Sequence, residues 1–172
     1  NIKSIEIINM KVNKGHTRCI AAGLKYIFEK KEFDFVIPMD GDGEDRPEEI
    51  KNFIKLSEQS GEKSIIGERV KRSEGLFFQL CYQFHKFLTL AFTGQSIKFG
   101  NFTCLSKSTV KKLLDEKATW NSFSGSLKKI EKDLISTPSI RGKRYFGPSQ
   151  MSFFNLLKHS LSIISVFRKT VL

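Results

Sequence analysis

Three closely spaced carboxylates in the first half of the chain could hold a divalent cation. Asp40, Asp42 and Glu44 lie two residues apart, with glycines between them. They follow residues 33–37 (FDFVI), a run that predicts a buried strand. Carboxylates on flexible backbone suit a hard cation such as Mg²⁺ or Mn²⁺. The carboxyl end of a strand is also where ligands bind in an open α/β sheet.

The same residues also allow two other interpretations. A solvated turn is one of them, because Asp-Gly is a common turn pair. A calcium-binding EF-hand is the other, and it fits poorly. That loop requires glycine at its sixth position and glutamate at its twelfth, where this chain has Asp45 and Lys51. The cation site and the turn therefore both stay open.

The composition describes a globular, strongly basic chain. Its 172 residues are 40% hydrophobic and 27% charged, enough for one domain with a core. The net charge of +11 favours contact with phosphates, nucleic acid or an anionic membrane surface. The three cysteines are widely spaced and odd in number, which favours a reducing compartment over a disulfide framework. We expect the chain to start inside a longer protein, because it begins with Asn1 and shows no signal peptide.

The hydrophobic pattern predicts an α/β fold with a mostly parallel sheet flanked by helices. Strands are expected at 5–8, 33–37, 64–67 and 97–105, and a helix is expected after the turn at 13–16. A second helix begins near Pro47, and a third covers 109–114 with a cap from Ser106 or Ser108. A long aromatic helix is expected over 76–92, and residues 120–134 give a mixed, mainly helical signal.

The C-terminal segment is basic and unusually apolar. Residues 141–172 contain no Asp or Glu, and apolar side chains crowd its helical part. An amphipathic helix at a membrane interface is one expectation, helped by attraction to anionic lipid. A helix that faces the core or another subunit is the alternative. No uncharged apolar run reaches the length of a transmembrane helix. We divide the chain into a catalytic-type domain at 1–148 and this amphipathic helix at 149–172.

Five segments, taken in order, resemble family 2 glycosyltransferases of the GT-A fold, a Rossmann-like α/β fold. They are Asn13-Lys14-Gly15-His16, Asp40-Gly41-Asp42-Gly43-Glu44, Gly67-Glu68-Arg69-Val70-Lys71-Arg72, Phe99-Gly100-Asn101-Phe102 and Arg144-Tyr145-Phe146-Gly147-Pro148-Ser149. The likeness is strongest to the branch that includes dolichol-phosphate mannosyltransferase and bacterial polyprenyl-phosphate sugar transferases. It covers nearly all of the chain.

The chain departs from that pattern in two places. The family's first strand, which binds the nucleotide base, is absent, so we expect a GT-A fold that lacks its first strand or strands. Relatives that glycosylate sugar hydroxyls carry a late Glu-Asp pair, where this chain has Trp120-Asn121-Ser122. A phosphate acceptor needs no deprotonation, so losing the base favours a polyprenyl phosphate.

The resemblance implies a role for each motif in an inverting transfer from a nucleotide-sugar donor. Asp42 and Glu44 would hold Mg²⁺ or Mn²⁺, and Asp40, Asp42 and Arg69 would form the catalytic group. Asp40, Arg69, Arg72 and His16 would bind the donor, although His16 could equally cap or pack its helix. Arg144 and Ser149 would hold the acceptor phosphate.

The expected partners are the donor, a polyprenyl-phosphate lipid and a membrane surface, at the cytoplasmic face of a membrane. A transferase for saccharide acceptors and a catalytically silent, membrane-associated binding module stay as alternatives. Nucleic acid is not expected as a partner, because the sequence shows no recognition helix, zinc motif or RNA-binding motif.

Overall fold

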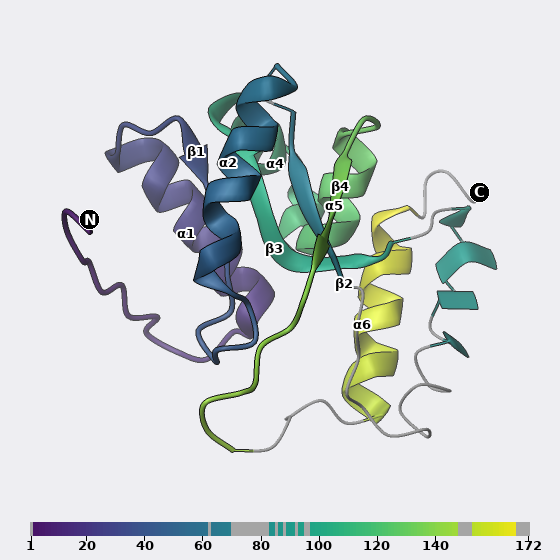
Figure 1. Ribbon diagram of the computed structural model, residues 1–172. Coiled ribbons are helices and arrows are strands. Elements are labelled where there is room, and N and C mark those ends of the chain that lie inside the picture. Colours follow the sequence, from purple (N-terminus) through teal and green to yellow (C-terminus); the bar gives the residue numbers. More distant parts are fainter. Residues whose placement is uncertain are drawn as a thin grey trace.

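The computed structural model has a four-stranded sheet with helices on both faces (Figure 1). It describes residues 2–61, 63–69, 83–84, 86–87, 89–91, 93–94, 97–147 and 153–167. The strands are β1 (Phe35–Val36), β2 (Ile65–Arg69), β3 (Phe99–Ser106) and β4 (Ile135–Ser139), in the order β1-β3-β2-β4.

Strand β3 makes the sheet mixed. It runs antiparallel to both of its neighbours, β1 and β2, whereas β2 and β4 are parallel. The predicted α/β class is therefore confirmed, but the expectation of a mostly parallel sheet is corrected. Strands β1, β2 and β4 share one direction, and β3 enters between two of them from the opposite end. Hydrophobic periodicity carries no information on strand direction, so the sequence did not reveal this.

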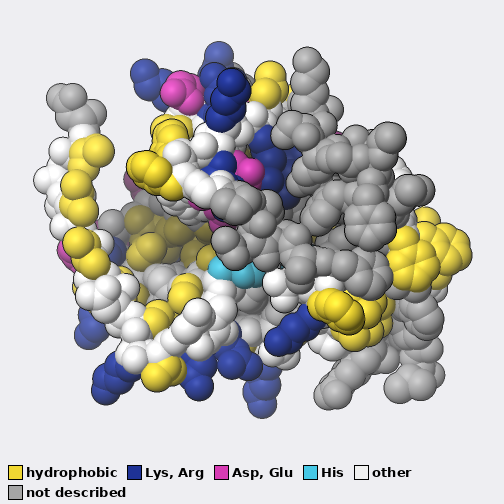
Figure 2. Space-filling model, turned by 90° about the horizontal axis from the view of Figure 1, so that it is seen from below, with side chains coloured by type: hydrophobic (Ala, Val, Ile, Leu, Met, Phe, Trp, Pro, Cys, Tyr) yellow, Lys and Arg dark blue, Asp and Glu magenta, His cyan; other side chains and the backbone are white. Residues whose placement is uncertain are grey.

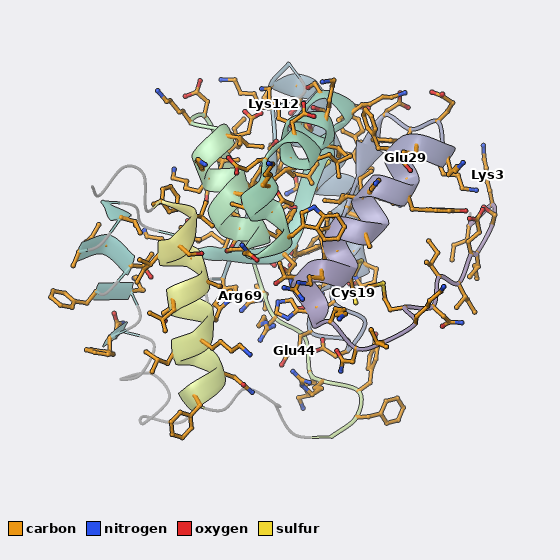
Figure 3. The ribbon with its side chains drawn as sticks, turned by 180° about the vertical axis from the view of Figure 1, so that it is seen from behind. Lys3, Cys19, Glu29, Glu44, Arg69 and Lys112 are labelled. Carbon is orange, nitrogen blue, oxygen red and sulfur yellow. The ribbon has the colours of Figure 1, made fainter. Side chains whose placement is uncertain are left out.

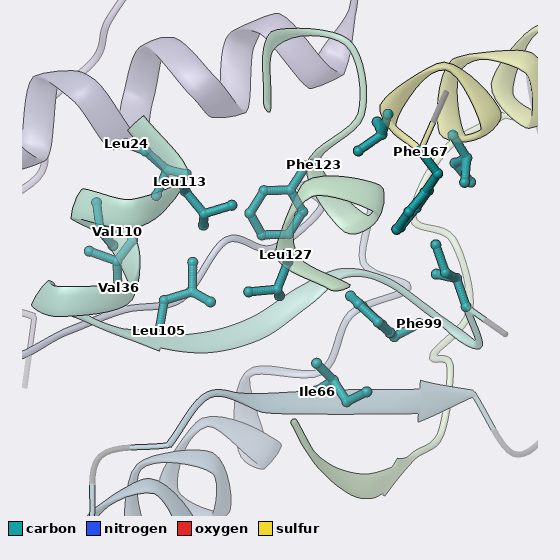
Figure 4. Packing of buried hydrophobic residues seen from close by; sticks show 13 residues of the cluster. Leu24, Val36, Ile66, Phe99, Leu105, Val110, Leu113, Phe123, Leu127 and Phe167 are labelled. Carbon is teal, nitrogen blue, oxygen red and sulfur yellow. The ribbon is translucent and has the colours of Figure 1, made fainter. Parts of the chain in front are cut away.

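Two hydrophobic clusters cover the two faces of the sheet. Helix α2 (Ile50–Gln59) packs Phe53 against Ile65, Phe102 and Cys104 on one face. The opposite face is covered by α1 (His16–Lys30), α4 (Lys107–Asp115), α5 (Phe123–Ile130) and α6 (Phe153–Val166) (Figure 4). Neighbours Ile65 and Ile66 belong to different clusters, because successive side chains of a strand point to opposite faces.

Side-chain caps and a proline fix the helix starts. Ser106 accepts a hydrogen bond from the Thr109 amide and caps α4, as predicted. Ser122 caps α5 in the same way, through the Gly125 amide. Pro47 opens a 3₁₀ turn (Pro47–Glu49) that leads into α2. A second 3₁₀ turn (Lys117–Trp120) precedes α5.

The region 120–134 and the segment after it differ from the prediction. The mainly helical signal over 120–134 is confirmed only in part: a 3₁₀ turn ends at Trp120, α5 covers Phe123–Ile130, and β4 follows. Strand β4 was missed because it is short, polar and contains Pro138. Proline is tolerated there because β4 lies at the edge of the sheet.

The predicted strand at 5–8 is wrong. Residues 2–10 have no regular structure, and Ile2, Ile5 and Ile7 are at least 80% exposed. They form an apolar ribbon beside α1, visible at the left of Figures 1 and 2. Glu6 ties the ribbon to the helix by accepting from the Tyr26 hydroxyl (3.0 Å) and by pairing with Lys31. The hydrogen bond from Lys31 lowers the pKa of Glu6.

The structure describes two further predicted helices, at 76–92 and within 149–172, to different extents. The predicted helix at 76–92 lies partly outside the described residues, and 83–84, 86–87 and 89–91 are helical. Helix α6 buries Ile163 and Val166 in the core and exposes Phe154 (78%) and Leu161 (59%). Among the helices that the structure describes, we find none both long and apolar enough to cross a membrane.

Candidate functional site

The predicted carboxylates stand on a turn that their own side chains help to close. We call residues 40–46, which follow β1, the acidic loop. Asp45 Oδ2 accepts a hydrogen bond from the Asp40 amide (2.8 Å), and Asp42 Oδ1 accepts one from the Glu44 amide (3.0 Å). Gly43 has φ +88°, a left-handed value that favours glycine. The local sequence therefore folds into a compact turn in which Asp42 and Glu44 are partly buried, with side chains 28% and 16% exposed.

Asp45 is the buried member of the acidic loop. Its side chain is only 5% exposed, and burial raises the pKa of its carboxyl group. The hydrogen bond from the Asp40 amide lowers that pKa, as do the charges of Arg69 and Arg141. Sequence reasoning assigned Asp45 no function. In the structure it positions Asp40.

A second segment lies along the acidic loop. Residues 140–145, which follow β4, form what we call the basic strap. The Gly142 amide donates to the Glu44 carbonyl and the Tyr145 amide donates to the Asp42 carbonyl, both at 2.8 Å. The Ile140 amide donates to Glu49 Oε1 at 3.1 Å. The loop and the strap, far apart in sequence, are thus joined through their backbones.

The arginines of the basic strap pair with the carboxylates of the acidic loop. Arg144 Nη2 lies 3.0 Å from Asp42 Oδ2 and 3.6 Å from Glu44 Oε2. Arg141 Nη1 lies 2.5 Å from Glu44 Oε2. All four side chains are less than 30% exposed, so water screens these pairs less than ordinary surface pairs. Acidic and basic side chains also meet on this lower face of the molecule in Figure 2.

The guanidinium of Arg141 lies close to the Glu44 carboxylate, but the two groups are poorly aligned for hydrogen bonding. Glu44 Oε2 and Arg141 Nε are buried, and neither atom makes a hydrogen bond in the described structure. Proximity without directional bonds leaves acceptor capacity on the carboxylate. Sequence reasoning overlooked Arg141, although its spacing of three from Arg144 on a strap without acidic residues was a usable signal.

Strand β3 and the end of β2 supply the next neighbours of the loop. Asn101 on β3 donates from Nδ2 to Asp40 Oδ1 at 3.2 Å. The side chain of Arg69, at the end of β2, passes so close to Gly100 that a Cβ there would lie 2.6 Å from Arg69 Nη2. Figure 3 shows Arg69 and Glu44 on the same side of the molecule. Arg69 is also near enough to Asp45 to lower the pKa of that carboxyl group.

The other predicted site residues are not brought to the loop by any described contact. His16 is exposed at the first turn of α1, where Thr17 Oγ1 lies 3.4 Å from its Nε2. Its donor role stays a prediction. Arg72 and Ser149 lie outside the described residues. The structure thus brings together Asp40, Asp42, Glu44, Arg69 and Arg144, and adds Asp45, Asn101 and Arg141.

The carboxylates fit the part that a protein supplies to a magnesium site. Within the residues described, no three His, Cys, Asp or Glu side chains are grouped to hold a metal ion. Mg²⁺ is usually held by one or two carboxylates, and substrate phosphates and water complete its six ligands. Asp42 and Glu44, brought within reach of the same guanidinium of Arg144, supply such a pair. The two carboxylates are thus the residues that could hold such a cation, and the arginines beside them have the chemistry to bind anionic oxygens.

Comparisons with known proteins agree on the kind of chemistry. Residues 1–116 match the family described as glycosyl transferase family 2. The chain is also similar to the undecaprenyl-phosphate 4-deoxy-4-formamido-L-arabinose transferase of Photorhabdus laumondii subsp. laumondii, with 27% identity over 157 residues. That alignment covers 84% of this chain and 44% of the relative, so the chain spans less than half of the relative's length.

Proposed function

The chain belongs to glycosyl transferase family 2, and on that basis we propose that it forms part of an enzyme transferring a sugar from a nucleotide-sugar donor to a polyprenyl phosphate. The observation that carries the proposal is the convergence of the acidic loop and the basic strap. Asp42 and Glu44 lie within 3.6 Å of Arg144, which supports a proposed cation-binding pair beside a side chain suited to anions. The name of the Photorhabdus relative supports the same kind of acceptor.

The donor would bind at the acidic loop. Asp42 and Glu44 would hold Mg²⁺ or Mn²⁺, which would bridge the diphosphate and neutralise the charge that develops on the leaving group. Asp40 would contact the donor, held in place by Asp45 and Asn101. Arg69, at the end of β2, would bind phosphate oxygens in the bidentate manner of arginine. Arg72 and His16 are proposed for the same donor.

A phosphate acceptor suits the described residues better than a sugar hydroxyl. The region at Trp120-Asn121-Ser122 has no carboxylate to remove a proton, and Ser122 is already engaged as the cap of α5. A phosphate oxygen is a ready nucleophile and needs no base. Arg144 and Ser149 would position it for attack at the anomeric carbon, with inversion. Rate enhancement would then come from positioning and charge stabilisation.

A membrane surface would present the lipid. Tyr145 (67% exposed) and Phe146 (89% exposed) follow Arg144 directly, and Phe154 (78% exposed) lies in the first turn of α6. Aromatic side chains beside basic ones favour the interface of a bilayer, where rings enter the headgroup region and cations meet anionic lipid. We therefore place the enzyme at the cytoplasmic face of a membrane, with segment 149–172 at the interface.

The test compares two Asp→Asn variants of the full-length protein in membranes. Asp42→Asn should lower sugar transfer from a nucleotide-sugar to polyprenyl phosphate by at least about 100-fold, the scale of losing one charge-stabilising group. Asp34→Asn is the matched control, since Asp34 is exposed and outside the loop. Transfer of radiolabelled sugar into lipid, measured with and without Mg²⁺, gives the readout. Normal turnover by the Asp42 variant would refute the assignment.

A further inference from the structure

The acidic loop and the basic strap use the oxygens that a cation would need. Arg141 Nη1 is 2.5 Å from Glu44 Oε2, and Arg144 Nη2 is 3.0 Å from Asp42 Oδ2. Mg²⁺ binds carboxylate oxygens at about 2.0–2.1 Å. A divalent cation on these oxygens would sit against two guanidinium groups and repel them. Arginine pairing and cation binding at these oxygens therefore oppose each other.

The strap is seated closely on the acidic loop between its two arginines. A Cβ on Gly142 would lie 2.6 Å from the Gly43 carbonyl oxygen, and a Cβ on Gly43 would lie 2.7 Å from the Tyr145 ring. The two segments thus touch backbone to backbone. Arg141 and Arg144 lie on either side of this contact, so their pairing with the loop and the seating of the strap are linked.

We infer that Arg141 is a positioning residue that holds the basic strap on the acidic loop in the cation-free protein, so that the strap and the cation occupy the loop in alternation. The inference rests on the proposed function, and it orders the steps of that function. Asp42 and Glu44 would exchange the arginines for a cation with its diphosphate first. The strap then leaves with Arg141 and Arg144 unpaired, ready to bind a phosphate. The coupling is reciprocal, so whatever weakens strap seating tightens cation binding.

The first experiment measures Mn²⁺ binding to the full chain without donor, from the electron paramagnetic resonance signal of free Mn²⁺. Arg141→Met should bind Mn²⁺ at least about ten-fold more tightly than wild type, within the usual range of coupling between sites. Lys143→Met is the control, because it removes the same charge from an exposed residue of the same strap. The inference fails if the two variants have equal affinity, or if Arg141→Met binds more weakly than wild type.

The second experiment keeps every charge. Gly142→Ala has no conformational penalty from positive φ, but its methyl group would clash with the Gly43 carbonyl and unseat the strap. It should also tighten Mn²⁺ binding. In wild type, the Gly142 and Tyr145 amides should exchange hydrogen slowly without cation and faster with saturating Mn²⁺ and a nucleoside diphosphate. Unchanged exchange at saturation would contradict the inference.

The two proposals fail in different ways. Loss of metal-dependent sugar transfer in Asp42→Asn, with no affinity change in the strap variants, would leave the enzyme assignment standing and remove the alternation. Tighter Mn²⁺ binding in Arg141→Met, in a protein that transfers no sugar, would support the alternation and remove the enzyme assignment.

Discussion

Replacing Asp45 tests whether the acidic loop is built around one buried hydrogen bond. Asp45 Oδ2 accepts the Asp40 amide at 2.8 Å, and the side chain is 5% exposed. Asp45→Ala removes the acceptor and leaves that amide unpaired. Asp45→Asn keeps an acceptor oxygen of the same reach and removes only the charge. The pair of variants therefore separates the hydrogen bond from the electrostatics.

The expected magnitudes differ between the two variants. An unpaired, partly buried amide costs about 1–3 kcal/mol, so Asp45→Ala should lose that much stability. Burial, the largest influence on Asp45, raises its pKa and so disfavours the charged form in the folded protein. Asp45→Asn relieves that cost and gives up attraction to Arg69 and Arg141. We expect it to stay within about 1 kcal/mol of wild type.

Urea unfolding at neutral pH, without divalent cations and followed by circular dichroism, measures both values. A loss of 1–3 kcal/mol corresponds to a midpoint shift of about 1 M at a typical denaturant slope. Asp34→Asn, at an exposed position, controls for the loss of one negative charge. The reasoning is refuted if Asp45→Ala is as stable as wild type, or if the Asn variant is destabilised as much as the Ala variant.

Further predictions concern the α2 face of the sheet and its cysteine. Phe53→Ala should cost about 3–5 kcal/mol in urea unfolding, because the ring is fully buried and stacks near Phe102, with centroids 4.6 Å apart. Burial raises the pKa of Cys104 from 9.0 to about 11. The unfolded chain therefore ionises first, and wild type should lose up to about 2–3 kcal/mol between pH 9 and pH 11. Cys104→Ala should lack that loss and Cys19→Ala should retain it; equal pH profiles would contradict this. Iodoacetamide should label exposed Cys19 in the folded chain and spare Cys104, as peptide mass spectrometry can check.

Features set by local chemistry were predictable from the sequence. The Ser106 cap placed α4, the buried run at 64–67 placed β2, and the glycine-separated carboxylates placed the acidic loop after a strand. Each depends on residues close together in sequence. The order of strands and helices predicted the α/β class, which the structure confirms, and the resemblance to a known family added the GT-A type of that class.

Features set by distant pairing were not predictable. The antiparallel placement of β3 and the edge position of β4 depend on which strands meet, and side-chain alternation is the same in either direction. The pair Arg141–Glu44 joins the basic strap to the acidic loop, and these segments are far apart in the chain. Neither segment alone predicts the pairing. Residues 5–8 failed as a strand because a strand needs a partner, and the described structure gives them none.

The apolar ribbon at residues 2–10 has a practical consequence for work with this chain. Unpaired backbone and isoleucines such as Ile5 and Ile7, each at least 80% exposed, make a template on which another extended segment can add. A concentrated sample would therefore tend to self-associate or aggregate through this ribbon. Dimers seen in light scattering should be checked against a variant such as Ile7→Lys before they are taken as a native property of this protein.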